Sequence, residues 1–251
     1  MKNKKITISY NGAAYHGFQR QANAITVQEV VETALSKLLG QETPITGCSR
    51  TDAGVHAREF CFNMRTSSTI PSEGLVKGLN ALLPRDIAVH FCEDVDESFH
   101  ARYSATGKEY VYLIRNAPIR DVFMRDLAYF YPRPLNINLM EQAAKLLIGE
   151  HDFSAYCKAE SLEAVKAKKH GAVREIYDLQ VKTHSEYVEL IVHGNGFLHN
   201  MVRIMAGTLV YISEGKRSLN DVHASLSGGK REMAGITLPA HGLYLNKVYY
   251  E

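Results

Sequence analysis

Alternating apolar and polar positions at the start of the chain predict a strand that ends in a turn. Ile6, Ile8 and Tyr10 are separated by single polar residues, and Asn11-Gly12 interrupts the run. Side chains of a strand alternate between its two faces, so this spacing puts the apolar ones on one face. We therefore expect the chain to open with a half-buried strand.

The next regular pattern has the spacing of an amphipathic helix. Thr26 and Glu29 form a capping-box pair, and Gly40 supplies a stop signal. The apolar residues between them recur at i, i+3, i+4 and i+7, namely Val27, Val30, Val31, Ala34, Leu35, Leu38 and Leu39. This is the clearest helix signal in the sequence.

Further strands and helices follow along the chain. Strands are expected over about 45–48, 55–65, 87–91, 110–114, 173–181, 187–193 and 244–250. Helices are expected after Pro71-Ser72, between a cap at Asn138 and Glu141 and a stop at Gly149, over about 197–213, and after Ser218. Each half then holds several strands with helices on one side, which is typical of an antiparallel α+β fold. We place the boundary near residue 105, giving halves 1–105 and 106–251 with a β-α-β-β-α-β-like order of elements.

Composition places the chain among ordinary globular proteins. It has 251 residues, of which 45% are hydrophobic and 22% charged, so it is long enough to bury a sizeable core. The formal net charge is 29 − 27 = +2, which excludes a strongly basic tail or arm. Any electrostatic attraction to a nucleic acid must therefore come from a local concentration of positive charge.

Cysteine usage and hydropathy indicate the compartment. The four cysteines form no Cys-x-x-Cys pair, and they stand far apart at Cys48, Cys61, Cys92 and Cys157. Such spacing is typical of buried thiols in a reducing compartment. The first ten residues lack the apolar run of a signal peptide, and no stretch approaches the ~18 apolar residues of a membrane span. We expect a soluble, cytoplasmic protein with no membrane partner.

Residues 47–57 gather more small, polar and charged side chains than a hairpin turn needs. One interpretation is structural: Asp52 accepts backbone N–H groups, Gly54 takes a positive φ, and Arg50 is simply exposed. The other interpretation is chemical, with Asp52 as a reactive carboxylate. The residue types alone leave both open, and turns of this kind are the commoner case.

A family resemblance bears on this choice. Eight consecutive residues resemble the signature of the tRNA pseudouridine synthase A (TruA) family, Arg50-Thr51-Asp52-Ala53-Gly54-Val55-His56-Ala57. Further stretches agree in order along the whole chain, among them Tyr10-Asn11-Gly12, Gly17-Phe18-Gln19-Arg20-Gln21, Phe99-His100-Ala101-Arg102, Phe197-Leu198-His199-Asn200-Met201-Val202-Arg203 and Gly242-Leu243-Tyr244-Leu245. Two positions depart from the family pattern, because Ser49 stands where Gly is more frequent and Phe18 where Trp is frequent.

The resemblance implies a fold and a reaction. Two ferredoxin-like α+β halves would join antiparallel sheets into one extended sheet, the first half carrying the catalytic loop and the second completing an RNA-binding cleft. The enzyme would convert uridine to pseudouridine in the anticodon stem-loop of tRNA, at positions 38 to 40. That reaction breaks the N1–C1′ bond, turns the base and joins C5 to C1′ without net redox change, so we expect no cofactor. Attack by the Asp52 carboxylate at C6 of the base and at C1′ of the sugar are both compatible with the residues.

Three other residues acquire catalytic roles from the resemblance. Tyr110 matches the base-stacking tyrosine, although a tyrosine in a strand commonly packs in a core. Arg50 would fill the space of the flipped base or pair with phosphate or with Asp52; the alternative is a surface ion pair. Arg203 would keep Asp52 ionised, and otherwise is an ordinary helix-surface charge.

Substrate binding is expected to use basic residues concentrated in one groove, together with a second copy of the chain. Besides Tyr110, the expected RNA contacts are Arg20, Arg58, Arg102, Lys168, Lys169 and His199. The resemblance also implies a homodimer. The eleven histidines include no His-Glu-x-x-His or Cys/His ligand spacing, so we expect no metal site. Two other classes of function remain open from the residues, a catalytically idle RNA-binding protein and a metal-dependent hydrolase.

Overall fold

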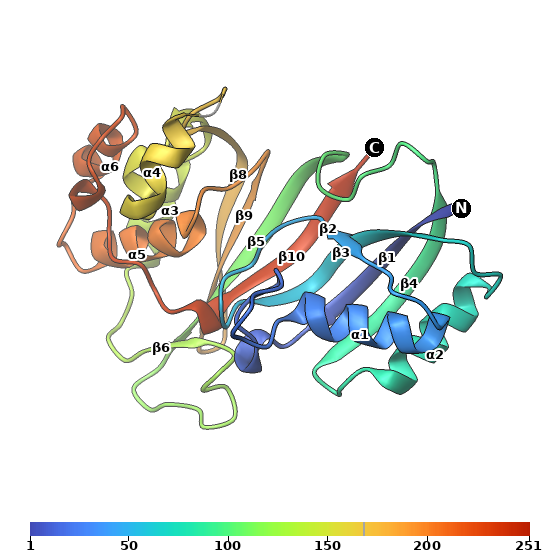
Figure 1. Ribbon diagram of the computed structural model, residues 1–251. Helices are drawn as coiled ribbons and strands as arrows, with labels where there is room; N and C mark the ends of the chain where they lie inside the picture. Colours follow the sequence, from blue (N-terminus) through green and yellow to red (C-terminus); the bar gives the residue numbers. More distant parts are fainter. Residues whose placement is uncertain (168) are drawn as a thin grey trace. The chain divides into compact units, whose positions relative to one another are not determined.

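The computed structural model describes residues 1–167 and 169–251, whose packing divides the chain into two compact units (Figure 1). One unit comprises residues 1–106 together with 244–251, and the other comprises residues 107–243. The last strand of the chain therefore packs with the first unit. The division of function at residue 105 stays a prediction.

The first unit has the element order β-α-β-β-α-β. Its elements are β1 (Lys2–Tyr10), α1 (Val27–Leu39), β2 (Ile45–Gly47), β3 (His56–Thr66), α2 (Ser72–Leu82) and β4 (Ile87–Val95), joined by β10 (Leu243–Tyr250). The central strand β1 pairs antiparallel with β3 and with β4. Beside β3, β2 pairs antiparallel with its far end and β10 pairs parallel with its beginning. This is the ferredoxin-like arrangement that the sequence predicts, with one parallel pair added.

Apolar side chains from the sheet and from both helices form the core of this unit. Ile6 and Ile8 on β1 and Phe60 on β3 are fully buried. Leu35 of α1 and Leu79 of α2 are also fully buried, and the two helices pack against each other (Figure 1). Burying each such side chain contributes about 1.5–3 kcal/mol to the free energy of unfolding, which makes this core the main source of rigidity beneath the site.

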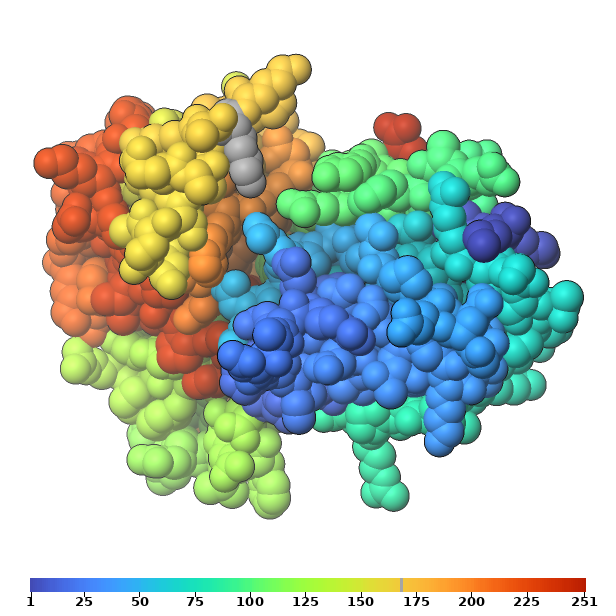
Figure 2. Space-filling model, in the orientation of Figure 1, coloured from blue at the N-terminus to red at the C-terminus, as the bar shows by residue number. Residues whose placement is uncertain are grey.

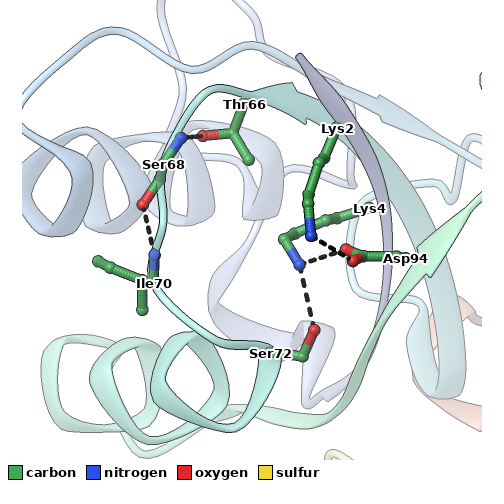
Figure 3. Close-up of polar contacts among 7 residues, drawn as sticks. All are labelled: Lys2, Lys4, Thr66, Ser68, Ile70, Ser72 and Asp94. Atoms are coloured by element: carbon green, nitrogen blue, oxygen red, sulfur yellow. Dashed lines mark hydrogen bonds and ion pairs between the residues drawn. The ribbon is translucent and has the colours of Figure 1, made fainter.

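A buried lysine ties β1 to its neighbours. Lys4 is 2% exposed, and its Nζ forms an ion pair with Asp94 of β4 and donates to Ser72 Oγ at 3.1 Å (Figure 3). Lys2 adds a second ion pair to Asp94, at 2.9 Å. The hydrogen bonds from Lys4 and then from Lys2 lower the pKa of the Asp94 carboxyl. The same view shows two bonds that shape the chain entering α2, from Ser68 N to Thr66 Oγ1 and from Ile70 N to Ser68 Oγ.

The second unit places four strands in the order β5-β9-β8-β7, with β6 added parallel to β5. Its elements are β5 (Ala105–Asn116), β6 (Tyr129–Tyr131), α3 (Ile137–Leu146), β7 (Gly149–Asp152), α4 (Ala159–Lys166), β8 (Val173–His184), β9 (Tyr187–Gly194), α5 (Met201–Ser213) and α6 (Leu219–Ser225). The pairs β5–β9, β9–β8 and β8–β7 are antiparallel. Helix α3 packs against α5, α6 and β8. The α+β class is confirmed.

Most of the expected elements are present, and the errors lie at both ends of α3, at the start of α5 and in three short elements. Helix α1 begins after Thr26, whose hydroxyl accepts the N–H of Glu29 at 3.4 Å, and it ends at Gly40 with φ +70°. The cap expected at Asn138 is wrong, because Asn136 caps α3 by accepting from Leu139 N. The stop expected at Gly149 is also wrong, because α3 ends at Leu146 with Leu147 as its C-cap, and Gly149 begins β7.

Helix α5 begins at Met201, four residues later than expected. The cause is Asn200, whose φ of +64° puts its backbone in the left-handed region and breaks a right-handed helix there. The sequence pattern also missed β6, β7 and α4, which are short elements of three, four and eight residues.

Candidate functional site

The segment that carries the family signature forms a tight loop between β2 and β3. The Val55 N–H donates to the Asp52 carbonyl at 3.1 Å, and Gly54 has φ +78°. The positive φ expected at Gly54 is therefore present. Thr51 and Val55 on either side are buried, whereas Asp52 is half-buried and Arg50 is exposed. The loop thus fixes its backbone while leaving the Asp52 side chain partly open to solvent.

Residues on β1 and just after it hold the loop immediately before Asp52. The Tyr10 hydroxyl lies 2.9 Å from Thr51 Oγ1, and both side chains are buried. The Phe18 N–H donates to the Thr51 carbonyl at 3.2 Å. Thr51 is consequently held at its side chain and at its backbone, one residue before the candidate nucleophile.

A second pair of bonds holds the loop after Asp52. The Gly54 N–H donates to the Tyr15 carbonyl at 3.2 Å. The Gly12 N–H donates to His56 Nδ1 at 3.0 Å, and the His56 ring stacks on Tyr244 of β10 with 4.7 Å between ring centroids. Because Nδ1 accepts this hydrogen bond, that nitrogen carries no proton in this arrangement. Residues 10–18, which we call the clasp segment, therefore bind the loop on both sides of Asp52.

Two glycines allow the clasp segment to lie this close. A Cβ on Gly12 would come within 1.9 Å of the Val55 carbonyl oxygen, and one on Gly17 within 2.4 Å of the Thr51 carbonyl oxygen. Gly17 also has φ +87°, a conformation that L side chains rarely adopt. The close approach of the two backbones therefore requires a residue without a Cβ at both positions.

The two departures from the family pattern are accommodated locally. Phe18 stacks on Phe60, with 4.1 Å between ring centroids, and a Cβ on Gly47 would lie 2.4 Å from its ring. Among the described residues, the positive φ values outside glycine belong to Ser185 and Asn200, so Ser49 needs no left-handed backbone. Its β-carbon does not obstruct the path into the loop.

The basic residues of the first unit differ in how far their charges are already engaged. Arg20 pairs with Glu32 at 3.1 Å, and its side chain is 53% exposed. Arg58 donates to Asn246 Oδ1 at 3.1 Å, with its guanidinium 4.9 Å from the centroid of the Tyr244 ring. Arg102 is exposed, 5.9 Å from the ring centroid of its neighbour Tyr103.

The remaining expected site residues belong to the second unit. Tyr110 on β5 is buried, and its ring meets Phe197 edge-on at 5.0 Å. On α5, Arg203 donates through Nε to the Leu238 carbonyl at 2.7 Å and through Nη1 to Asn200 Oδ1 at 2.8 Å. These bonds fix the guanidinium, so Arg203 is not a freely moving surface charge.

The last expected contacts of the second unit are polar and exposed. His199 is exposed, with Nδ1 2.8 Å from Ser161 Oγ. Lys169 is exposed, and Lys168 lies outside the described residues. The first unit thus holds Asp52, Arg50, Arg20, Arg58 and Arg102, and the second holds Tyr110, Arg203, His199 and Lys169.

Sequence reasoning missed the residues that hold the loop. The sequence pattern assigns Tyr10, Thr51 and His56 no role in holding the loop, yet each of them bonds across the clasp. The signal that points to them is the stretch Tyr10-Asn11-Gly12, where a glycine follows a strand end without a simple hairpin after it.

Two searches over the described part of the chain bear on other classes of site. No group of three or more His, Cys, Asp and Glu side chains in residues 1–167 and 169–251 is arranged to hold a metal ion. In the same ranges, none of the helices has the length and apolar character that crossing a membrane requires.

Fold and loop together define an α+β protein that presents a carboxylate from a rigidly held loop. A family model described as tRNA pseudouridine synthase matches residues 6–104 and 143–251. Proteins named tRNA pseudouridine synthase A from Thermoanaerobacter sp. (strain X514) and Ruminiclostridium cellulolyticum are 44% and 45% identical over 100% of both chains. One from Bacillus pumilus is 44% identical over 98% of both. The chain therefore belongs to the tRNA pseudouridine synthase family, and it is an isomerase.

Comparison with solved structures adds little. A chain titled as an unknown protein from Galdieria sulphuraria covers 85% of this chain, and 92% of its own length is matched. Its TM-score is 0.22 at 12% identity, which carries no argument about fold or function.

The clasp predicts a sharp effect of adding one methyl group at Gly12. Gly12→Ala forces the Cβ against the Val55 carbonyl, so we expect overpacking to lower the free energy of unfolding by about 1–3 kcal/mol and to shift the loop. Gly78→Ala on α2 is the matched control, because the atoms nearest its Cβ belong to the flexible side chain of Leu38 and not to the backbone. Urea unfolding and pseudouridine formation measure the two effects. Equal stability and activity in both variants would contradict the close approach.

Proposed function

We propose that this protein isomerises uridine to pseudouridine in the anticodon stem-loop of tRNA, at positions 38 to 40, with Asp52 as the nucleophile. The observation that supports the role of Asp52 is its placement: the residues before and after it are held by the clasp segment, while its own side chain is half-buried. A reactive carboxylate needs both properties, a fixed position and access to the substrate.

The isomerisation requires a nucleophilic carboxylate and few other reactive groups. The N1–C1′ bond breaks, the uracil turns, and a C5–C1′ bond forms while the proton on C5 is released and N1 takes up a proton. Asp52 serves either by adding to C6 of the base or by capturing C1′ of the sugar, and it leaves again in both routes. No atom is gained or lost overall, so the proposal includes no cofactor.

Access to the target base requires that uridine leave its stack. Flipping a base costs a few kcal/mol, which stacking on an aromatic ring partly offsets. We assign this stacking to Tyr110, whose ring is held edge-on by Phe197. Arg50 is exposed and so is free to reach a phosphate or the space that the base vacates. We assign a supporting catalytic role to Arg203, whose guanidinium is fixed by Leu238 and Asn200.

Affinity for tRNA is assigned to basic residues and to a second copy of the chain. With a net charge of +2, the protein has to concentrate its positive charge locally to bind phosphate. The proposed contacts are Arg20, Arg58, Arg102, Lys168, Lys169 and His199. Arg20 would exchange its ion pair with Glu32 for one with phosphate. A homodimer acting in the cytoplasm completes the proposal.

Replacing the carboxylate tests the catalytic role directly. Asp52→Asn keeps the shape and turn hydrogen bonding of Asp52 but removes the nucleophile, so we expect turnover to be lost with tRNA affinity nearly unchanged. Asp126→Asn is the matched control, because that carboxylate is exposed and pairs with the adjacent Arg125. Pseudouridine assays and tRNA binding by filter retention measure both. Activity of Asp52→Asn within about tenfold of wild type would contradict this mechanism.

Two substitutions at Tyr110 separate stacking from packing. Losing a base–aromatic stack costs about 1–3 kcal/mol, so Tyr110→Ala should weaken capture of the flipped uridine, whereas Tyr110→Phe should still hold it. If the hydroxyl also relays the C5 proton, Tyr110→Phe binds tRNA normally but stalls after the glycosidic bond breaks.

Tyr110 is buried, so melting temperature is measured beside the single-turnover rate. A purely packing role predicts that Tyr110→Ala loses about 3–5 kcal/mol of stability while its folded fraction turns over at the wild-type rate. That result would remove Tyr110 from the active site.

A further inference from the structure

We infer that the hydroxyl pair Tyr10–Thr51 is a positioning device for the reaction, which sets where the Asp52 carboxylate lies. The inference rests on the proposed function, because it assumes that Asp52 attacks the substrate. We assign Tyr10 no step of the reaction, so it is a positioning residue and not a catalytic one.

The tyrosine end of the pair is a fixed point. Tyr10 is the last residue of β1, where it pairs with Ala57 of β3 on one side and Ile87 of β4 on the other. Its ring is 4% exposed and lies 5.7 Å from the ring of Phe60, centroid to centroid. A strand paired on both sides and a packed ring leave the hydroxyl little freedom to move.

The threonine end transmits that fixed position to Asp52. Thr51 is 8% exposed, its Oγ1 lies 2.9 Å from the Tyr10 hydroxyl, and its carbonyl accepts the Phe18 N–H at 3.2 Å. Adjacent Cα atoms are joined rigidly at about 3.8 Å by a planar peptide, so a shift or rotation of Thr51 passes directly to Asp52. The pair is thus the side-chain bond closest in sequence to the nucleophile on its N-terminal side.

The Tyr10–Thr51 bond is not explained by its contribution to the stability of the fold. A buried bond between two neutral hydroxyls replaces bonds that both groups make with water, so its net contribution to folding is small. Phenylalanine and valine would fill nearly the same volume without any polar group to satisfy. What these apolar residues would lack is a directional bond, and direction is what a nucleophile beside a substrate requires.

The test replaces both hydroxyls of the pair together, so that neither one is left without its partner in the pair. For Tyr10→Phe/Thr51→Val we expect the single-turnover rate to fall about 10- to 100-fold, the cost of a nucleophile displaced by about an ångström. The dissociation constant for tRNA should stay within about twofold of wild type, because the variant removes no binding group. The melting temperature should stay close to that of wild type.

A second hydroxyl pair in the same chain provides the matched control. Tyr156 and Ser225 are buried, with Tyr156 Oη 2.9 Å from Ser225 Oγ, the same separation as in Tyr10–Thr51. Tyr156→Phe/Ser225→Ala therefore removes a buried tyrosine–serine hydroxyl pair far along the sequence from the loop, together with the bond from Ser225 Oγ to the Val222 carbonyl at 2.6 Å. We expect it to keep the wild-type rate.

Comparing Thr51→Ser with Thr51→Val separates the effect of the hydroxyl on the rate from an effect of changed folding. Thr51→Ser keeps the hydroxyl, so it should exceed Thr51→Val in rate by about the factor seen in the double variant. The inference is overturned if Tyr10→Phe/Thr51→Val reacts at the wild-type rate, or if both double variants lose rate only in step with lost folded protein. Absence of pseudouridine with the wild-type protein would instead refute the proposed function.

Discussion

The close approach of residues 12–17 to the loop that carries Asp52 is the constraint on which the site depends. Gly12 and Gly17 permit it, because a Cβ at either position would collide with a loop carbonyl oxygen. Because the two backbones lie this close, N–H groups of the clasp segment donate hydrogen bonds to Thr51 and His56. The loop is thereby tied to the paired strands β1 and β3. The two glycines thus allow the backbone bonds that hold the loop on both sides of Asp52.

The same constraint links packing to the chemistry of the family. A carboxylate that must meet one carbon of a flipped base has to be held before the substrate arrives, since ordering it during the reaction would raise the barrier. The core formed by Ile6, Ile8 and Phe60 holds β1 and β3 in place. The loop that carries Asp52 is bonded to these strands and is therefore held as well. Asp52 remains half-buried, so rigidity of the backbone does not close off the side chain.

The sequence pattern predicted the features that depend on neighbouring residues, namely the order of elements and the ends of α1. The α+β order follows from hydrophobic periodicity, and α1 begins and ends where Thr26 and Gly40 indicate, because caps act on neighbouring residues. The start of α5 was wrong because Asn200 adopts a left-handed conformation that the periodicity does not encode. The Tyr10–Thr51 bond joins residues 41 positions apart, so it depends on strand pairing and no local pattern shows it. Asp52 is proposed from its motif, whereas the residues that hold its loop are identified only from the fold.

Mapping pseudouridine in tRNA from cells tests the central claim most directly. Three strains are compared: one with the wild-type protein, one lacking it, and one carrying only Asp52→Asn. The account predicts pseudouridine in the anticodon arm, at positions 38 to 40, only in the first strain, with uridine at those positions in the other two. Pseudouridine that persists at these positions without the protein, or that returns with Asp52→Asn, would contradict it.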